Sequence, residues 1–231
     1  LSEKNKYPFR PEKLENISTN QDETKPYISF DGNTALFVRK VKQRSKNEES
    51  FYQQTSFITK DVLCQAFLEF NEDLGIWEFD EGFPINEFEN VVNKPTKVSL
   101  TADNKQMYFS YLDKASGKYQ IYCSHSVGGV WSKPENIGNI VNDATANLVD
   151  PFITADGNTL YFSSDKKGGQ GGYDIWVTHK SKNSSWLKPT NLGKRINTPR
   201  NETSPYLHAD NNSFYFSSNG WKGFGDMDLF Y

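Results

Sequence analysis

A short block of sequence is repeated four times along this chain, and the repetition constrains the fold more than any other feature. The clearest copy, residues 150–164, has a proline, a short apolar run, an Asp-Gly-Asn turn and the ending Tyr-Phe-Ser-Ser. It returns over 204–218, and fainter copies run over 25–38 and 98–110. The later copies follow one another at intervals of roughly 54 residues, a period that is typical of a β-propeller when each unit holds several strands.

One repeat can be divided into four strands. In the third copy, residues 151–154 are short and apolar, and after a turn of Asp, Gly and Asn the segment 159–164 is β-branched and aromatic. A glycine-rich loop leads to a third strand over 173–178, and a fourth is expected over 186–193. Pro189 suits an outer edge strand, where a missing N–H costs little. Four antiparallel strands that end on an exposed edge describe a propeller blade.

We therefore predict an all-β fold, a single β-propeller domain over residues 1–231 with four recognisable four-stranded blades. The repeats cover approximately 11–77, 78–131, 132–186 and 187–231. The first is longer because an insertion over 39–60 replaces the glycine loop. The last lacks a fourth strand, and residues 7–17 resemble the missing segment. Two interpretations remain open: a four-bladed ring closed by the N-terminal strand, or an open piece of a five- or six-bladed ring.

The later repeats also resemble a known family. Their order continues into Gly-Gly-Gln-Gly-Gly-Tyr-Asp-Ile-Trp over 168–176 and Gly-Phe-Gly-Asp-Met-Asp-Leu-Phe-Tyr over 223–231. These segments resemble the WD40-like propeller repeats of envelope proteins in Bacteroidota, above all OmpA-family, peptidoglycan-associated lipoproteins of the PorE type, which are linked to type IX secretion. The likeness covers about 11–231. It implies a periplasmic or outer-membrane-associated protein, partners among envelope or secretion-system proteins, and a further blade after Tyr231.

The bulk properties exclude some classes of protein. The net charge of −3 gives no basic footprint for nucleic acid. No run approaches the ~18 apolar residues that a membrane-spanning helix needs. The chain opens at Leu1 without a signal core, so we expect a processed chain or a piece of a longer one. Cys64 and Cys123 are expected to be buried, reduced thiols, although a disulfide between them stays open.

The motifs of propeller enzymes were compared with the repeat. Gly157 directly follows Asp156, which breaks the Asp-box of sialidases, and no Gly-x-Ser-x-Gly segment for a prolyl-peptidase exists. Asp150 and Glu202 precede first strands and fit loop caps better than the facing carboxylates of a glycosidase. The sequence therefore predicts no catalytic residues and a protein that is not an enzyme.

Cofactor and metal sites are not expected either. The glycine loop at 168–172 joins two strands and opens no helix, so it lacks the dipole that binds phosphate. His125, His179 and His208 do not have metal-ligand spacing. The Asp-rich turns lack the Asp-x-Asp-x-Asp-Gly pattern of a calcium loop.

What remains is a surface for binding. In a propeller, the loops between second and third strands share one face with the loops that lead into first strands. Aromatic and cationic side chains among small residues are typical of recognition surfaces. The candidate partner-binding residues are Arg39, Lys42, Arg44, Lys167, Tyr173, Arg200, Trp221 and Phe224. The basic insertion can equally be a solvated hairpin, and Trp221 and Phe224 can equally fold over a blade edge.

The predicted function is a non-catalytic scaffold for protein–protein contacts in a bacterial envelope assembly, without a cofactor. The alternative is a propeller that binds or hydrolyses glycans, in which Tyr173, Trp176 and Trp221 stack on sugars. An open channel with two carboxylates about 5–10 Å apart would favour the alternative, and a channel filled by Phe and Leu would count against it.

Overall fold

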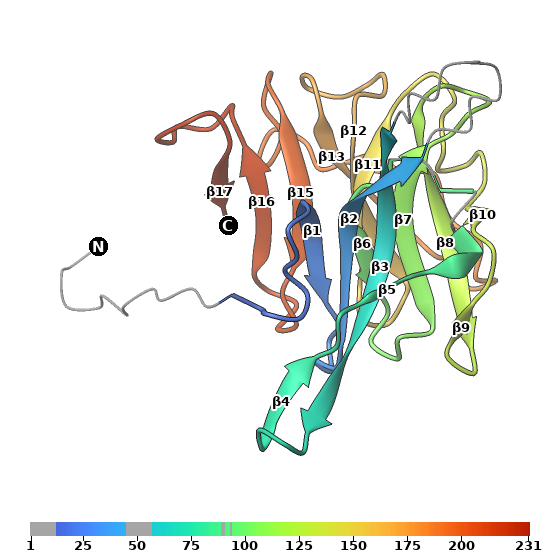
Figure 1. Ribbon diagram of the computed structural model, residues 1–231. Helices are drawn as coiled ribbons and strands as arrows, with labels where there is room; N and C mark the ends of the chain where they lie inside the picture. Colours follow the sequence, from blue (N-terminus) through green and yellow to red (C-terminus); the bar gives the residue numbers. More distant parts are fainter. Residues whose placement is uncertain (1–12, 45–56, 89–90, 93) are drawn as a thin grey trace, which may run out of the picture.

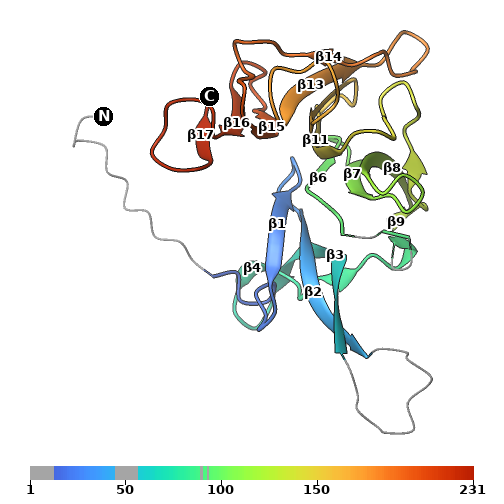
Figure 2. The same cartoon turned by 90° about the horizontal axis from the view of Figure 1, so that it is seen from above.

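The computed structural model describes residues 13–44, 57–88, 91–92 and 94–231, and within them the regular structure is almost entirely β-strand. The strands form four antiparallel sheets around a common axis, which Figure 1 shows from the side and Figure 2 along the axis. This is the fold of a four-bladed β-propeller.

The first two sheets each have five strands in the described chain. The first contains β1 (Glu23–Ile28), β2 (Thr34–Arg44), β3 (Phe57–Asn71), β4 (Ile76–Phe79) and β5 (Phe83–Pro84), and β4 and β5 both pair with β3. A short 3-10 helix, η2 (Asn86–Phe88), follows. The second contains β6 (Val98–Leu100), β7 (Gln106–Leu112), β8 (Tyr119–Val127), β9 (Val130–Trp131) and β10 (Glu135–Asn136), and β9 and β10 both pair with β8.

The last two sheets are smaller. The third contains β11 (Leu148–Ile153), β12 (Thr159–Ser164), β13 (Asp174–His179) and β14 (Thr190–Asn191). The fourth has three strands among the described residues, β15 (Glu202–Leu207), β16 (Phe214–Ser218) and β17 (Asp228–Phe230). The first strand of each sheet, β1, β6, β11 or β15, lies nearest the axis (Figure 2).

Three of the innermost strands share a bulge at the residue before a proline. The pairing of β1 with β2 shifts register between Thr24 and Tyr27, and the same shift occurs at the equivalent places in β11 and β15. Proline has no amide hydrogen for the neighbouring strand, and a bulge takes it out of the ladder. The bulge also redirects the side chain that precedes the proline, which matters for the axis.

Apolar side chains fill the spaces between neighbouring sheets. Leu36, Phe109 and Tyr122 belong to the cluster between the first and second sheets, and Leu160 and Phe162 to the cluster between the second and third. Phe109 and Phe162 are fully buried. Burial of one such side chain contributes about 1.5–3 kcal/mol, so these interfaces hold the first three sheets together.

The predicted all-β propeller with four blades is confirmed, and so are the predicted pairs of inner strands. The predicted fourth strands differ in detail. The segments 131–138 and 186–193 are not continuous strands, because each pairs only in short pieces on either side of Pro134 or Pro189. The missing N–H of proline interrupts the ladder there.

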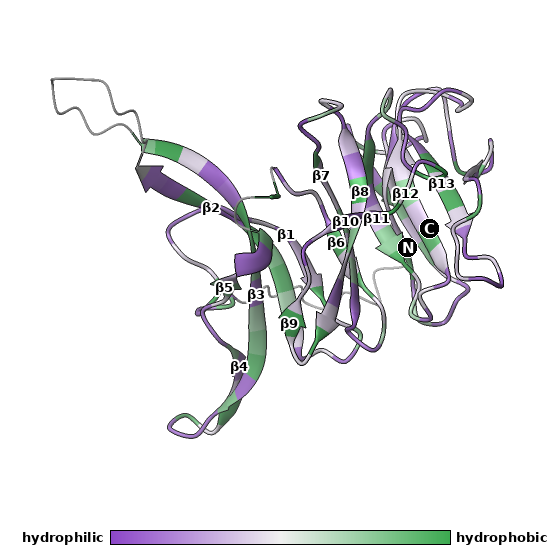
Figure 3. Cartoon of the chain, turned by 90° about the vertical axis from the view of Figure 1, so that its right-hand side faces the viewer, coloured by the Kyte–Doolittle hydropathy of each residue, from purple (hydrophilic) through white to green (hydrophobic). Residues whose placement is uncertain are grey.

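Both described ends of the predicted insertion over 39–60 are strand. Residues 39–44 continue β2 and residues 57–60 continue β3, and the pairing runs without a shift from Arg39 opposite Val62 to Arg44 opposite Phe57. This end of the hairpin projects beyond the neighbouring sheet (Figure 3). Residues 45–56 lie outside the described chain, as does most of the predicted closing strand over 7–17.

Candidate functional site

Three inner strands, and the residue that directly precedes the fourth (β6), bring side chains from one repeat position to the axis. These residues, Lys25, Lys97, Asp150 and Ser204, are named the axial cluster here. The Ser204 hydroxyl donates to Asp150 Oδ2 at 3.3 Å, and Lys25 Nζ donates to the carbonyl of Pro95 at 2.7 Å. The charges of Lys25 and Lys97 both act on Asp150. Since Lys25 and Asp150 belong to opposite sheets, they can interact in this way only across the axis (Figure 2).

The axial cluster lies at one end of the axis, above a layer of aromatic rings. Phe152 and Tyr206 pack with ring centroids 5.0 Å apart, and the Tyr27 hydroxyl donates to the carbonyl of Leu100 at 3.3 Å. These rings fill the axis beneath the polar groups. Lys25 is exposed and the other three members of the cluster are partly exposed, so solvent reaches them from the open end.

Burial disfavours the charged forms of Asp150 and Lys97. Burial raises the pKa of Asp150 above its usual range, although Lys97, the Ser204 hydroxyl and Lys25 act in the opposite direction. Burial lowers the pKa of Lys97, although Asp150 opposes the shift. Both shifts disfavour the charged forms. Perturbed groups that face a specific charge partner mark a candidate functional site.

The loops at the same end of the propeller are fixed to one another. We call this end, uppermost in Figure 1, the loop face, and the opposite end the turn face. The amide of Gly172 donates to the carbonyl of Arg200 at 2.7 Å, and the amide of Tyr173 donates to Asn201 Oδ1 at 3.0 Å. The indole N–H of Trp221 donates to the carbonyl of Ile196 at 2.8 Å. Three loops of the third and fourth sheets therefore form one surface.

Five of the eight predicted binding residues lie on this surface. Trp221 is 41% exposed and Phe224 is fully exposed. Lys167 and Arg200 are exposed, and Tyr173 is partly buried. The sequence-based hypothesis that these five residues share a face therefore agrees with their positions, and their role in binding remains a prediction.

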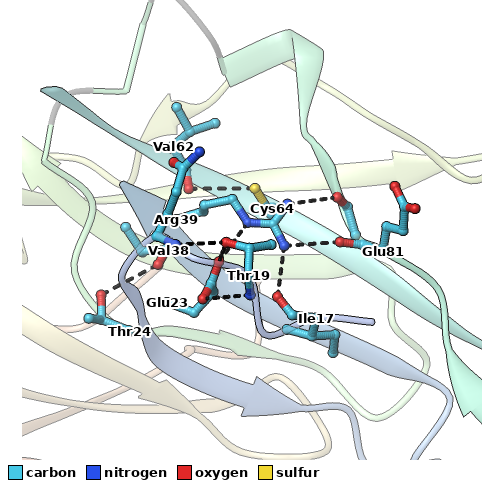
Figure 4. Close-up of polar contacts among 11 residues, drawn as sticks. Ile17, Thr19, Glu23, Thr24, Val38, Arg39, Val62, Cys64 and Glu81 are labelled. Carbon is cyan, nitrogen blue, oxygen red and sulfur yellow. Dashed lines mark hydrogen bonds and ion pairs between the residues drawn. The ribbon is translucent and has the colours of Figure 1, made fainter. Parts of the chain in front are cut away.

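The guanidinium of Arg39, a sixth candidate, is held by contacts within the first sheet (Figure 4). Its Nε donates to Glu23 Oε1 at 2.9 Å, and its terminal nitrogens donate to the carbonyls of Ile17, Glu81 and Gly82 at 2.9, 3.0 and 3.3 Å. Only 13% of the Arg39 side chain is exposed. Arg39 thus holds the outer segments of the first sheet together, and its guanidinium is not available to a binding partner.

The remaining candidates have different positions. Lys42 is exposed on β2, and Arg44 is the last described residue of that strand. Trp176, which the glycan hypothesis used, is buried between the second and third sheets and lies under the ammonium of Lys166. It therefore cannot stack on a sugar, and the filled axis also counts against an open glycan channel.

The carboxylates that precede first strands are used in two ways. Glu202 is fully buried and accepts hydrogen bonds from the Thr198 amide, the Thr198 hydroxyl and the Ser218 hydroxyl. It closes the lead-in loop of the fourth sheet, as predicted for a cap. Asp150 instead faces lysines at the axis. No group of three or more possible metal ligands occurs among the described residues, and no helix in them could span a membrane.

Sequence reasoning missed Lys25, Lys97 and Ser204 as members of a site. A signal was present, because three cluster members directly precede the proline of their repeat, and Lys97 aligns with them. The residue before the proline has a positive φ in β1, β11 and β15, namely 57° at Lys25, 51° at Asp150 and 54° at Ser204. Such a conformation costs a non-glycine residue about 1–3 kcal/mol and is often found at functional sites.

Comparison with known proteins identifies the fold. No family profile matches the sequence, and no curated protein matches it. TolB from Acinetobacter baumannii is similar in structure, with a TM-score of 0.51, 16% identity, and coverage of 93% of this chain and 42% of TolB. A puromycin-hydrolysing peptidase of Mycobacterium tuberculosis has a TM-score of 0.50 and 12% identity over 90% of this chain and 29% of its own. The chain thus spans less than half the length of either protein.

The prediction that this protein is not an enzyme, which was drawn from the absence of known catalytic motifs, is wrong as it stands. A solved propeller that resembles this protein, the puromycin-hydrolysing peptidase above, is an enzyme. At 12% identity the likeness establishes only the propeller fold. The fold therefore does not decide between catalysis and scaffolding.

Proposed function

We propose that this protein is a docking propeller of a bacterial cell-envelope assembly and holds an acidic segment of another protein against its loop face. The observation that carries the proposal is a cluster of cationic and aromatic side chains on loops of the third and fourth sheets. This cluster, the basic-aromatic rim, consists of Lys167, Lys194, Arg195, Arg200, Trp221, Lys222 and Phe224.

The rim has a positive charge, although the whole chain has a net charge of −3. Its five cationic residues are all exposed. The carboxylates of the same loops are used internally. Asp165 accepts from the amide and side chain of Asn147, Asp226 accepts from Asn219, and Asp228 accepts from the amide of Phe224. Free cations around exposed aromatic side chains suit an acidic partner, since the cations speed its capture and the aromatic side chains anchor it.

The rim is also prepared for binding. The Trp221 indole is fixed by its hydrogen bond to Ile196, and the loops beneath it are joined by backbone hydrogen bonds. A surface that is ordered before binding loses less conformational entropy in the complex. The envelope setting rests on the resemblance of the repeats to those of envelope lipoproteins, and the likeness of the fold to TolB agrees with it. Type IX secretion, linkage to peptidoglycan and a periplasmic location belong to this proposal.

Selection of peptides from a random display library on the purified protein tests the proposal. We expect the selected peptides to be rich in Asp and Glu and to lose affinity as salt increases. Phe224→Ser and Arg200→Ser should each weaken their binding by roughly 5–30-fold, the usual effect of removing an anchor. Matched controls are Leu187→Ser, a half-exposed apolar residue of the third sheet, and Lys105→Ser, an exposed cation of the turn face.

Two outcomes would refute the docking proposal. One is selection of peptides without acidic enrichment. The other is acidic peptides whose affinity responds equally to the rim and control substitutions, because that result would show attraction to the chain in general.

A further inference from the structure

The axial cluster contains hydrogen-bond donors that the fold leaves free. Within the described part of the chain, the ammonium of Lys97 forms no hydrogen bond and interacts only with the charge of Asp150. Lys25 Nζ uses one of its three donors on the Pro95 carbonyl. A partly buried ammonium without hydrogen-bonding partners costs stability. Such a group is stabilised when a ligand supplies the missing acceptors.

The charges and positions of the cluster define what would fit. Lys25 and Lys97 against Asp150 leave a formal charge of +1. The Ser204 hydroxyl now donates to Asp150 and can rotate to a second acceptor. The aromatic layer lies beneath the site, and Lys97, Asp150 and Ser204 each keep a part that solvent, and therefore a ligand, can reach. A single negative charge with two acceptor oxygens matches this set.

The charged groups around the axial cluster also favour a ligand with a single negative charge. The charges of Asp150 and of Asp165 both act on the Tyr173 hydroxyl, so Asp165 is a second carboxylate on this side of the cluster. These carboxylates would repel a dianion such as phosphate. The cluster also lacks a guanidinium for bidentate phosphate binding. A monoanion is therefore the better match.

We propose that the axial cluster is a binding site for one carboxylate group, whether of a small free acid or of an acidic side chain. The carboxylate oxygens accept hydrogen bonds from the ammonium groups of Lys97 and Lys25 and from the Ser204 hydroxyl. Asp150 remains beneath as a counter-charge that limits affinity and keeps the two lysines in place. The site is separate from the basic-aromatic rim, so either proposal can fail without the other.

Titration of the ¹⁵N-labelled protein, followed by amide chemical shifts, tests this site. The probes are acetate and an acetyl-Gly-Glu-Gly-amide peptide, with acetamide and the Gln peptide as neutral controls of the same shape. We expect saturable shifts at the amides of Lys97, Asp150 and Ser204 with at least one carboxylate probe and none with the neutral probes. Binding of acetate alone assigns a small acid, and binding of the peptide assigns an acidic side chain as a ligand.

Two substitutions separate binding from structure. Lys97→Met should weaken the carboxylate by about tenfold or more, because it removes the free ammonium while keeping the length of the side chain. Asp150→Asn should tighten it by about tenfold, because it removes a like charge beside the ligand. Lys94→Met, at a nearby exposed lysine, is the control and should leave the affinity unchanged.

The contrary view is that Lys97 and Asp150 form only a structural ion pair. On that view Asp150→Asn gives no gain in carboxylate affinity. The proposal is overturned if Asp150→Asn has no such effect in a folded protein, if acetate and acetamide give the same shifts, or if Lys97→Met binds as the parent does. Near-ultraviolet circular dichroism establishes that each variant is folded.

Discussion

Replacement of Arg39 by methionine should destabilise the fold far more than replacement of its neighbour Lys40. Arg39→Met removes four hydrogen bonds and the contact of the guanidinium with the Phe37 ring, 5.0 Å from its centroid. It leaves Glu23, whose side chain is only 15% exposed, without its counter-charge. The ion pair of Lys40 with Asp22 is similar in length at 2.9 Å, but those side chains are 46% and 67% exposed.

The expected loss of unfolding free energy in Arg39→Met follows from the burial of Arg39 and Glu23. Loss of the counter-charge of a mostly buried carboxylate costs about 1–2 kcal/mol, and three carbonyls left without a charged donor add about 0.5 kcal/mol each where water can reach them. The sum is about 3 kcal/mol, or a fall in Tm of about 6–12 °C for a domain of this size. Lys40→Met should cost at most about 0.5 kcal/mol, as exposed pairs do.

Urea and thermal unfolding, followed by tryptophan fluorescence and circular dichroism, measure both substitutions. Arg39→Lys keeps the charge but not the planar fork, so its stability should lie between the parent and Arg39→Met. Burial would raise the pKa of Glu23, but hydrogen bonds from Thr19 and Arg39 outweigh it and hold the pKa below its usual value. Glu23 therefore stabilises the fold above its unfolded-state pKa, and the gap between parent and Arg39→Met should narrow as pH falls through the lower folded value. Equal effects of Arg39→Met and Lys40→Met would refute this reasoning.

Three further predictions concern stability and reactivity. Asp150→Asn should raise the free energy of unfolding at pH 7, because the pKa of Asp150 is higher in the folded than in the unfolded state. The gain in stability should disappear below the unfolded-state pKa, and a variant that is less stable than the parent at pH 7 would contradict this prediction. Gly171→Ala should lower Tm, because the added methyl carbon would lie 2.3 Å from the backbone of Pro199 in the loop that leads into β15. Gly225→Ala is the control and should leave Tm unchanged, because its methyl group would enter open space. Equal Tm values for the two variants would show that the loops are not in contact. Burial raises the pKa of both Cys64 and Cys123 to about 11, so alkylation at pH 8 should require unfolding, and rapid labelling of the folded protein would show exposed thiols.

The sequence predicts the blades well because their determinants are local and repeated. Each inner hairpin has an Asp in its turn. In three of the four turns the carboxylate accepts a hydrogen bond from the hydroxyl two residues earlier, as Asp156 does from Thr154 at 2.6 Å and Asp103 from Thr101 at 2.6 Å. Such turns depend on a few adjacent residues. Their spacing sets the blade length, and the prolines of the fourth strands mark the outer edge.

The sequence also groups the residues of the loop face, because a repeat fixes which loops share an end of the propeller. It does not show which cationic residues are free. Arg39 has the sequence context of an exposed residue in a basic run, yet three of its acceptors are main-chain carbonyls, two of them more than 40 residues away. A backbone oxygen has no signature in the side-chain pattern.

The axial cluster is decided by tertiary structure. Its members are separated by whole repeats, and each has a different chemical nature, so similarity between repeats hides them. Closing the sheets around one axis brings Lys25, Lys97, Asp150 and Ser204 together, and the bulges before three prolines direct their side chains to it. The fold class follows from the local preferences of each repeat for strands and turns. The electrostatics of the axial cluster arise only when residues of opposite blades face each other across the axis, where partial burial strengthens the interaction of their charges.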